Sequence, residues 1–286
     1  MDARLAGLVR LLELERLEVN TFRGASRDIG SPQVYGGQVL GQALQAAYAT
    51  VDADRVVHSL HAYFLRRGDF NAPIVYIVDR SRDGHSFTSR RVTAIQHGEQ
   101  IFNCSASFQR AEPGFEHQLG MPEVPPPEAL ADSSAPGSPF IEGLAPRLRQ
   151  FVHERPIEFR MVPSAATQAG APHQYLWIRM VDRLPDDDRL HRCLLAYASD
   201  FHLLGTSLIQ HERSIAQGKL VIASIDHVMW FHRPVRMDEW LLYAADSPSA
   251  SGARGFTRGS LYTRAGTLVA STAQEGLVRV LPPTAS

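Results

Sequence analysis

Hydrophobic and polar positions alternate along this chain in two similar series, separated by a stretch that keeps no period. Runs rich in β-branched and aromatic residues, bounded by turn-forming residues, are typical of strands. They predict strands at residues 56–66, 73–81, 87–96 and 100–110, and again at residues 220–233, 239–246, 254–264 and 267–280. A shorter strand is expected ahead of each series, near residues 17–23 and 173–181.

One long helix is expected between the short strand and the longer strands of each series. Apolar side chains recur at helical spacing over residues 34–49 and over residues 198–209. A helix that packs across an antiparallel sheet buries the apolar faces of both elements. The pattern therefore predicts an α+β fold, in which two tandem helix-plus-antiparallel-sheet units pair edge to edge as one continuous sheet.

The two series also match each other along the chain, which indicates an internal duplication. HAYFLRRGDFNAPIVYIVD at 61–79 aligns with VMWFHRPVRMDEWLLYAAD at 228–246, an offset of 167 positions. The shared residues are Phe64 with Phe231, Arg66 with Arg233, Tyr76 with Tyr243 and Asp79 with Asp246. Upstream, YGGQVLGQAL aligns with YASDFHLLGT and sets Gln38 against Asp200. Only one unit then carries the acid, so we expect one site per chain, where the units meet.

Residues 113–146 differ in composition from the rest of the chain, because prolines, small residues and polar residues dominate them. Such a composition is typical of a linker, extended where the prolines cluster. The sequence therefore predicts an N-terminal unit at 1–112, a linker at 113–146, and a C-terminal unit at 147–286 that carries Asp200.

The composition of the 286-residue chain narrows its class and its partners. A hydrophobic fraction of 44% supports a sizeable core, and a net charge of −1 gives no argument for nucleic acid. No apolar run approaches the ~18 residues of a membrane span, and the first residues lack the core of a signal peptide. The last residues, LPPTAS, are not a peroxisomal S-K-L ending. We expect a cytoplasmic protein that does not insert into membranes.

The sequence lacks several motifs that would indicate a bound cofactor or a catalytic nucleophile. It contains no G-x-S-x-G, no H-E-x-x-H and no G-x-x-x-x-G-K-[ST], and GGQVLG lacks the spacing of a dinucleotide fingerprint. Cys104 and Cys193 form no metal spacing. The histidine pairs His58 with His61 and His227 with His232 have odd spacing on strands, so each pair points to opposite faces. We therefore expect chemistry without a metal or cofactor.

Asp200 is the one acid in the apolar stretch CLLAYASDFHLLGTSLI, at residues 193–209. Two interpretations are open from the residue alone. Asp is a favoured helix N-cap, and a cap is the commoner role of a lone Asp ahead of a helical pattern. Alternatively, burial in an apolar site would raise the pKa of the carboxyl and make it a better base.

Six segments together resemble the acyl-CoA thioesterase II (TesB-type) family over about residues 10–280: VYGGQVLGQAL, HSLHAYFLRRGD, AYASDFHLLGTSL, ASIDHVMWFHRP, GARGFTRGSLY and VASTAQEGLVR. The resemblance implies a double hotdog fold and a hydrolytic water held by an Asp, a hydroxyl residue and a Gln. Those residues are Asp200 in YASDF, Ser224 in IASIDH and Gln274 in STAQEG. Bacterial members usually carry Thr where this chain has Ser224. The resemblance also makes His58, in HSLHAY, a candidate site residue, but a weaker one than these three.

The residue types suit thioester hydrolysis. Asp can act as a general base, and a Gln amide can orient a water without changing charge. Gly36 and Gly37, at a helix start, would either offer N–H groups to an oxyanion or serve only tight packing. Arg66, Arg67, Arg90 and Arg91 are candidates, by charge alone, for nucleotide phosphates.

The expected function is the hydrolysis of fatty acyl-CoA to free fatty acid and CoA. The family resemblance also implies a homo-oligomer, either a dimer or a tetramer. Two alternatives stay open: a hotdog enoyl-CoA hydratase or dehydratase, and an acyl-CoA binding module without catalysis. Thiol release separates the expected function from both.

Overall fold

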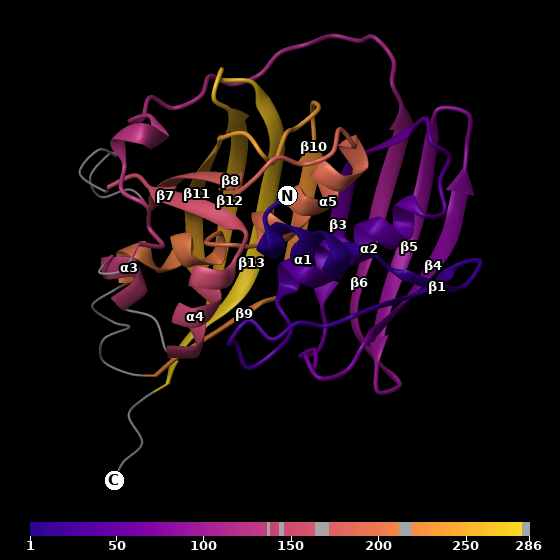
Figure 1. Cartoon of the computed structure of the whole chain (residues 1–286), viewed down its shortest axis with the longest axis horizontal. Coiled ribbons are helices and arrows are strands. Elements are labelled where there is room, and N and C mark those ends of the chain that lie inside the picture. Colours follow the sequence, from indigo (N-terminus) through magenta and orange to yellow (C-terminus); the bar gives the residue numbers. More distant parts are fainter. Residues whose placement is uncertain (136–137, 143–145, 164–171, 212–218, 282–286) are drawn as a thin grey trace.

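The computed structural model describes residues 1–135, 138–142, 146–163, 172–211 and 219–281. Within these ranges, one sheet of 13 strands forms the centre of the molecule, and α1, α2 and α5 lie across one face (Figure 1). The strand order is β1-β2-β4-β5-β6-β3-β10-β13-β12-β11-β8-β7, with β9 paired to β13. This confirms the expected α+β class and the single continuous sheet.

The first unit has the expected order of helix and four longer strands, but the single short strand expected near residues 17–23 is wrong, because a turn at residues 19–20 divides this segment into two paired strands. Its elements are α1 (Ala3–Leu12), β1 (Glu15–Glu18), β2 (Thr21–Gly24), α2 (Gly36–Tyr48), β3 (Arg55–Phe64), β4 (Ile74–Asp83), β5 (Phe87–Gln96) and β6 (Glu99–Arg110). The four longer strands lie where the alternation of apolar and polar residues places them.

The connecting segment and the second unit complete the chain. Their elements are η1 (Pro127–Ala129), α3 (Pro139–Glu142), α4 (Pro146–Glu154), β7 (Ile157–Met161), β8 (His173–Met180), α5 (Asp188–Ser199), η3 (Leu204–His211), β9 (Lys219–Ser224), β10 (Asp226–Phe231), β11 (Leu241–Ser251), β12 (Arg254–Thr263) and β13 (Leu268–Leu281). One expected strand is divided at Ile225, which donates to Glu275 O and accepts from Phe64 N–H. The end of the C-terminal unit, residues 282–286, lies outside the described residues.

The expected helix at 198–209 is wrong, because α5 begins and ends ten residues earlier. Its start has a clear cause: the Asp187 side chain accepts from the backbone N–H of Arg189 and caps the first turn. The apolar spacing continues past the end of α5 because the chain stays buried in η3, around Leu204. Burial therefore extended the helical pattern beyond the helix.

The units join through an antiparallel pairing of β3 with β10. Tyr63 pairs with Asp226 and Ser59 pairs with Trp230, so each β3 residue corresponds to the β10 residue 167 positions later. This is the offset found in the sequence, and it makes the two units equivalent about an approximate two-fold axis through this strand pair.

The helices α2 and α5 pack against each other in opposite directions beneath the joint. A Cβ on Gly37 would lie 2.2 Å from Tyr197 O, and a Cβ on Gly41 would lie 3.1 Å from Cys193 O. Glycine at both positions lets the two backbones approach closely. The first turn of α2 is thereby held against the last turn of α5.

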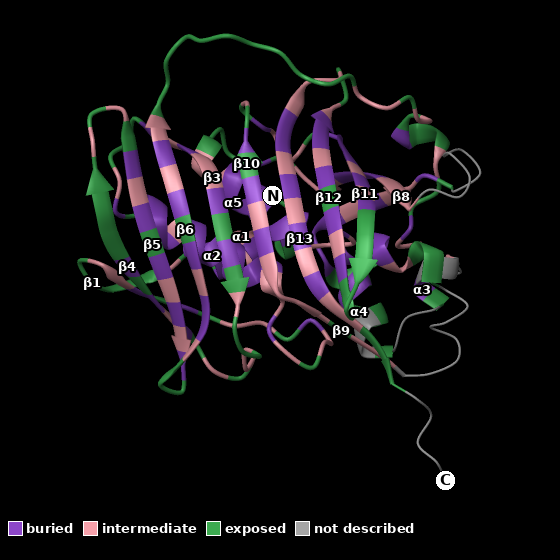
Figure 2. Cartoon of the chain, turned by 180° about the vertical axis from the view of Figure 1, so that it is seen from behind, coloured by how far each residue is buried: buried purple, intermediate pink, exposed green. Residues whose placement is uncertain are grey.

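The two units differ on the outer face of the sheet, which Figure 2 shows from behind. In the second unit the connecting segment covers this face: Met121, Val124 and Leu130 pack on Trp177 and Tyr262. In the first unit, and at the joint, Tyr63 and Trp230 stay exposed. No helix among the described residues is long and apolar enough to cross a membrane.

Candidate active site

Asp200 occupies the position that ends α5, with φ −81° and ψ −12°. It does not cap the start of a helix, so the N-cap interpretation is wrong. The C-terminal end of a helix carries partial negative charge, which disfavours a carboxylate. Only 7% of the Asp200 side chain is exposed. An acid in this place costs stability, so its presence needs another reason.

The first turn of α2 faces this carboxylate from the other unit. The backbone N–H of Gly37 donates a hydrogen bond to Asp200. A Cβ on Gly36 would lie 2.7 Å from Asp200 Oδ2, so only glycine leaves room for the carboxyl there. The positive end of α2 thus offsets part of the unfavourable field at the end of α5. In this structure the Gly37 N–H serves the carboxylate and not an oxyanion.

Gln274 and Ser224 complete a three-residue cluster with Asp200. Gln274 Nε2 lies 2.8 Å from Asp200 Oδ1 and 2.9 Å from Ser224 Oγ. A carboxylate only accepts, which fixes Nε2 as the amide atom that faces Asp200. Gln274 Oε1 is buried and has no hydrogen-bond partner within the described residues. Strands β9 and β13, which pair at Ser224 and Gly276, hold the two side chains side by side.

The pKa of Asp200 is raised above its ordinary value. Burial is the main cause, and the hydrogen bonds from Gln274 and Gly37 act in the opposite direction. A buried carboxyl with a raised pKa is a stronger base than an exposed one. The site therefore has the electrostatic character that general-base chemistry requires.

A cavity of about 230 Å³ opens beside this cluster, and Gly36 and Ser224 form part of its wall. Its apolar walls come from α2, β3, β6 and the segments next to them: Val34, Val39, Phe64, Leu65, Ile101 and Phe102. Arg66 and Arg67 line it as well. The cavity therefore combines apolar walls with two cationic side chains, and it reaches the three-residue cluster at Ser224.

The equivalent place in the first unit holds no such cluster. The strand registers make Val57 correspond to Ser224 and Ala106 to Gln274. Ala49 ends α2 as Asp200 ends α5, so the expected match of Asp200 with Gln38 is wrong. The first unit therefore has no acid, hydroxyl or amide at the positions equivalent to those of the cluster.

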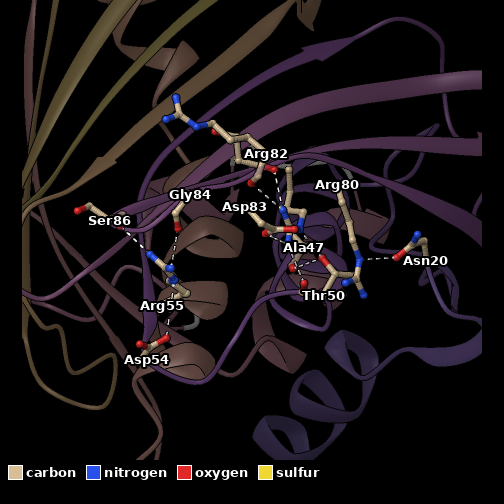
Figure 3. A network of polar contacts seen from close by, with 12 residues as sticks. Asn20, Ala47, Thr50, Asp54, Arg55, Arg80, Arg82, Asp83, Gly84 and Ser86 are labelled. Carbon is tan, nitrogen blue, oxygen red and sulfur yellow. Dashed lines mark hydrogen bonds and ion pairs between the residues drawn. The ribbon is translucent and has the colours of Figure 1, made fainter.

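Arg90 occupies that space. It is buried, and it donates from Nε to Thr50 Oγ1 at 2.9 Å and from an Nη to Thr50 O at 2.9 Å. Further bonds reach Arg82 O and the Asp83 carboxylate, whose residues are labelled with Thr50 in Figure 3. All three nitrogens of its guanidinium donate to protein oxygens. Arg90 is therefore not available to bind a phosphate of the substrate. Arg91 points to the opposite, exposed face.

His58 is not brought to this site. Its Nε2 lies 2.8 Å from Ser107 Oγ, and its ring packs edge-on against Phe87. Phe64, which borders the cavity, is six residues further along β3, or about 20 Å at the rise of a strand. The structure thus separates His58 from Asp200, Ser224 and Gln274.

One histidine near the acid was not expected from the sequence. His227 is fully buried, and its Nδ1 lies 4.0 Å from Asp200 Oδ1. Burial lowers its pKa to about 3, which keeps the ring neutral. The signal was its position three residues after Ser224, in the same strand region. Among the described residues, no group of three or more His, Cys, Asp or Glu could hold a metal ion.

Comparison with solved structures defines the class of protein first. A hot dog fold protein from Alicyclobacillus acidocaldarius superimposes with a TM-score of 0.77 over 96% of this chain and 98% of that one. At 20% identity this likeness shows the fold alone. The duplicated helix-plus-sheet unit is therefore a hotdog unit, and the chain is a double hotdog protein.

Comparison at higher identity shows the family. The acyl-CoA thioesterase family matches residues 147–277, and the acyl-CoA thioesterase N-terminal domain matches residues 24–109. Acyl-CoA thioesterase 2 of Haemophilus influenzae is 43% identical over 98% of this chain and 99% of its own. Acyl-CoA thioesterase II TesB2 of Mycobacterium marinum is 45% identical, with a TM-score of 0.83 over 96% and 98% of the two chains. The chain belongs to the TesB-type acyl-CoA thioesterase family, a family of thioester hydrolases.

Proposed function

We propose that this protein hydrolyses fatty acyl-CoA to free fatty acid and CoA, with a water activated by Asp200 and oriented by Ser224 and Gln274. The observation that carries the proposal is the double hydrogen bond of Gln274 Nε2, to Asp200 Oδ1 and Ser224 Oγ, beside the cavity. A buried base, a hydroxyl and an amide converge there, and the names of the relatives support a thioester as substrate.

The reaction balances without a cofactor. The water oxygen bonds to the thioester carbonyl carbon, while Asp200 takes one of the water protons. The tetrahedral intermediate then collapses, the C–S bond breaks, and Asp200 returns the proton to the CoA sulfur. A thiol has a reference pKa of about 8.5, so its thiolate leaves readily. The other product is a carboxylic acid, which ionises in solvent.

Ser224 and Gln274 have distinct roles in aiming this water. Gln274 Oε1 is a buried acceptor without a partner among the described residues, so it can accept a hydrogen bond from the water. Ser224 Oγ can accept or donate, and it lines the cavity where the thioester would lie.

The cavity suggests how the substrate lies. Val39, Phe64 and Phe102 offer an apolar wall to the acyl chain. Arg66 and Arg67 lie on the same cavity and suit the phosphates of CoA. Arg66 is held by Gln100 O at 2.8 Å and by Glu99 at 2.9 Å, so it is already oriented.

Thiol release from acyl-CoAs of increasing chain length tests the proposal. Asp200→Asn should lose at least about a hundredfold in kcat, because Asn cannot take the proton. Asp226→Asn is the matched control: that neighbouring carboxyl also has a raised pKa through burial, but its Oδ1 accepts from Glu275 N–H at 2.6 Å. No release by the wild type would reject hydrolysis, and equal losses in both variants would reject Asp200 as the base.

The same assay addresses the two alternatives. A hydratase would consume enoyl-CoA without thiol release, and a binding module would hold acyl-CoA without turnover. We also propose that the protein acts in the cytoplasm as a homo-oligomer. Cys104 and Cys193 are free, which suits a reducing compartment, and Tyr63 and Trp230 leave aromatic surface for a second copy. Cell fractionation and sedimentation equilibrium check these two points.

A further inference from the structure

His227 has one nitrogen in use and one without a partner. Its Nε2 lies 2.9 Å from Ser199 Oγ, in the last turn of α5. Its Nδ1 is buried, has no hydrogen-bond partner among the described residues, and lies 4.0 Å from Asp200 Oδ1. The imidazole thus bridges from the helix that presents the acid to the acid itself.

The surroundings of Ser199 decide which nitrogen carries the proton. Ser199 Oγ lies 3.0 Å from Ala196 O and 3.3 Å from Met229 Sδ, and both of these atoms only accept. The single hydroxyl proton of Ser199 is directed to one of them. The proton between Ser199 and His227 therefore belongs to His227 Nε2, and Nδ1 presents a lone pair toward Asp200.

A lone pair opposite a carboxylate finds no proton until the carboxyl is protonated. During hydrolysis Asp200 takes a proton from the water and becomes a donor. Nδ1 is then a buried acceptor without a partner among the described residues, and closing the 4.0 Å separation by about 1 Å would give a normal hydrogen bond. Such a bond stabilises the protonated form of the acid and makes its carboxylate a stronger base.

We propose that His227 is a positioning residue that accepts a hydrogen bond from protonated Asp200 through Nδ1, and so strengthens Asp200 as the base. This inference rests on the proposed hydrolysis. The proton stays on Asp200 until it moves to the CoA sulfur, and the imidazole stays neutral throughout. His227 does not line the cavity and acts only through the acid.

The other ionisable groups around the pair do not compete for this role. Tyr35, at the start of α2, and Tyr243, in β11, lie near Asp200, and Tyr197, in α5, packs against Tyr35; burial raises the pKa of each phenol. The charge of Asp200 raises the pKa of Tyr35 and Tyr243 further. Arg155, which directly follows α4, stays protonated with a pKa of about 10. None of these groups changes charge between pH 5 and 8.

Two variants separate the nitrogens of His227. Asn places an amide atom near Nδ1 and can keep the acceptor, whereas Gln reaches the position of Nε2 and keeps only the donor to Ser199. The measurement is kcat/KM against pH with the best acyl-CoA substrate. His227→Gln should move the midpoint of the acid limb down by about one pH unit and lower kcat about tenfold, with KM unchanged. His227→Asn should retain the wild-type midpoint.

The outcomes are distinguishable from those of the proposed hydrolysis. Equal midpoints in both variants, with Asp200→Asn inactive, would overturn the role of His227 and leave the hydrolysis in place. Thiol release that survives Asp200→Asn would remove the hydrolytic role of Asp200 itself. A measurement on the wild type does not depend on whether the variants fold. ¹⁵N NMR of the His227 imidazole should show a proton on Nε2 and none on Nδ1. A proton on Nδ1 would overturn the inference.

Discussion

The backbone N–H of Gly37 hydrogen-bonds the carboxylate of Asp200, and the two residues come from different hotdog units. Gly37 lies in the first turn of α2, and Asp200 ends α5. Their contact depends on the opposite directions of the two helices, so neither unit has this arrangement alone. The candidate base is set by the pairing of the units and not by either sequence half.

Gly37→Ala should weaken the fold and the activity together. The new Cβ would lie 2.2 Å from Tyr197 O, a backbone atom that cannot move without α5. We expect a loss of about 2 kcal/mol or more in the free energy of unfolding, and a displaced Asp200. Gly7→Ala, inside α1 with nothing within 4 Å of its Cβ, is the control and should stabilise slightly. Urea unfolding of both proteins checks this, and equal midpoints would contradict it.

Asp200→Asn should stabilise the protein at pH 8 while it abolishes the proposed reaction. The folded-state pKa of Asp200 is raised, so the fold prefers the protonated form and loses stability as pH rises through that pKa. Asn carries no charge, and the Gln274 amide can turn to pair with it. A gain of about 1 kcal/mol, or about 2 °C in Tm, is expected at pH 8. The gain should shrink as the pH is lowered toward the ordinary pKa of an Asp, about 3.9, and a gain that grows on acidification would oppose this account.

Two histidines, His227 fully buried and His202 half-buried, should make the fold sensitive to acid. Burial lowers the pKa of His202 and of His227 to about 3, whereas the unfolded chain protonates each near 6.5. Stability is therefore present above pH 6.5 and is lost as pH falls toward 3, by about 1.4 kcal/mol per pH unit for each residue. His202→Asn keeps a residue type that tolerates the positive φ of 65° and should flatten the loss. Denaturant midpoints from pH 7 to 5 measure the slope.

Arg90→Met should destabilise the first unit without touching the candidate site. The substitution keeps much of the volume but removes the bonds to Thr50, Arg82 and Asp83. Buried oxygens then lose their donor, and about 3 kcal/mol of the free energy of unfolding should be lost. Arg91→Met, one residue away on the exposed face, is the control. Similar thermal shifts for the two variants would show that the buried network contributes little.

Arg66→Gln and Arg67→Gln should raise KM for acyl-CoA more than for the matching acyl-pantetheine. Both side chains line the cavity, and only the CoA ester carries nucleotide phosphates for them to bind. An increase of about fivefold to tenfold in KM is expected for CoA esters, with kcat nearly unchanged. Equal effects on both substrates would place the phosphates elsewhere. Arg91→Gln is again the outer-face control.

The strands and the duplication were predictable because both depend on local pattern. Period-two alternation located β3 to β6, and the 167-residue offset reappears in the pairing of β3 with β10. The helix before Asp200 was misplaced because apolar spacing does not distinguish a buried helix from the buried 3₁₀ turn after it. The sequence PDDD at residues 185–188 held the better signal, a proline followed by an Asp cap.

The candidate site was predictable as a set of residues but not as an arrangement. Asp200, Ser224 and Gln274 were found by motif, and their hydrogen bonds needed three elements to be placed in space. Charge alone could not tell that Arg66 can bind a phosphate and Arg90 cannot. Burial and hydrogen-bond partners decide which guanidinium is free to contact a ligand. His227 was missed for the same reason, since the direction of a buried imidazole is a property of its neighbours.

The Arg90 network also bears on how this chain can change. A second site in the first unit would need an acid at Ala49, a hydroxyl at Val57 and an amide at Ala106, together with the removal of Arg90. Each step taken alone would bury an unpaired polar group or empty a filled space. No single substitution leads from this protein to a two-site enzyme, so the asymmetry between its halves is stable against gradual reversal.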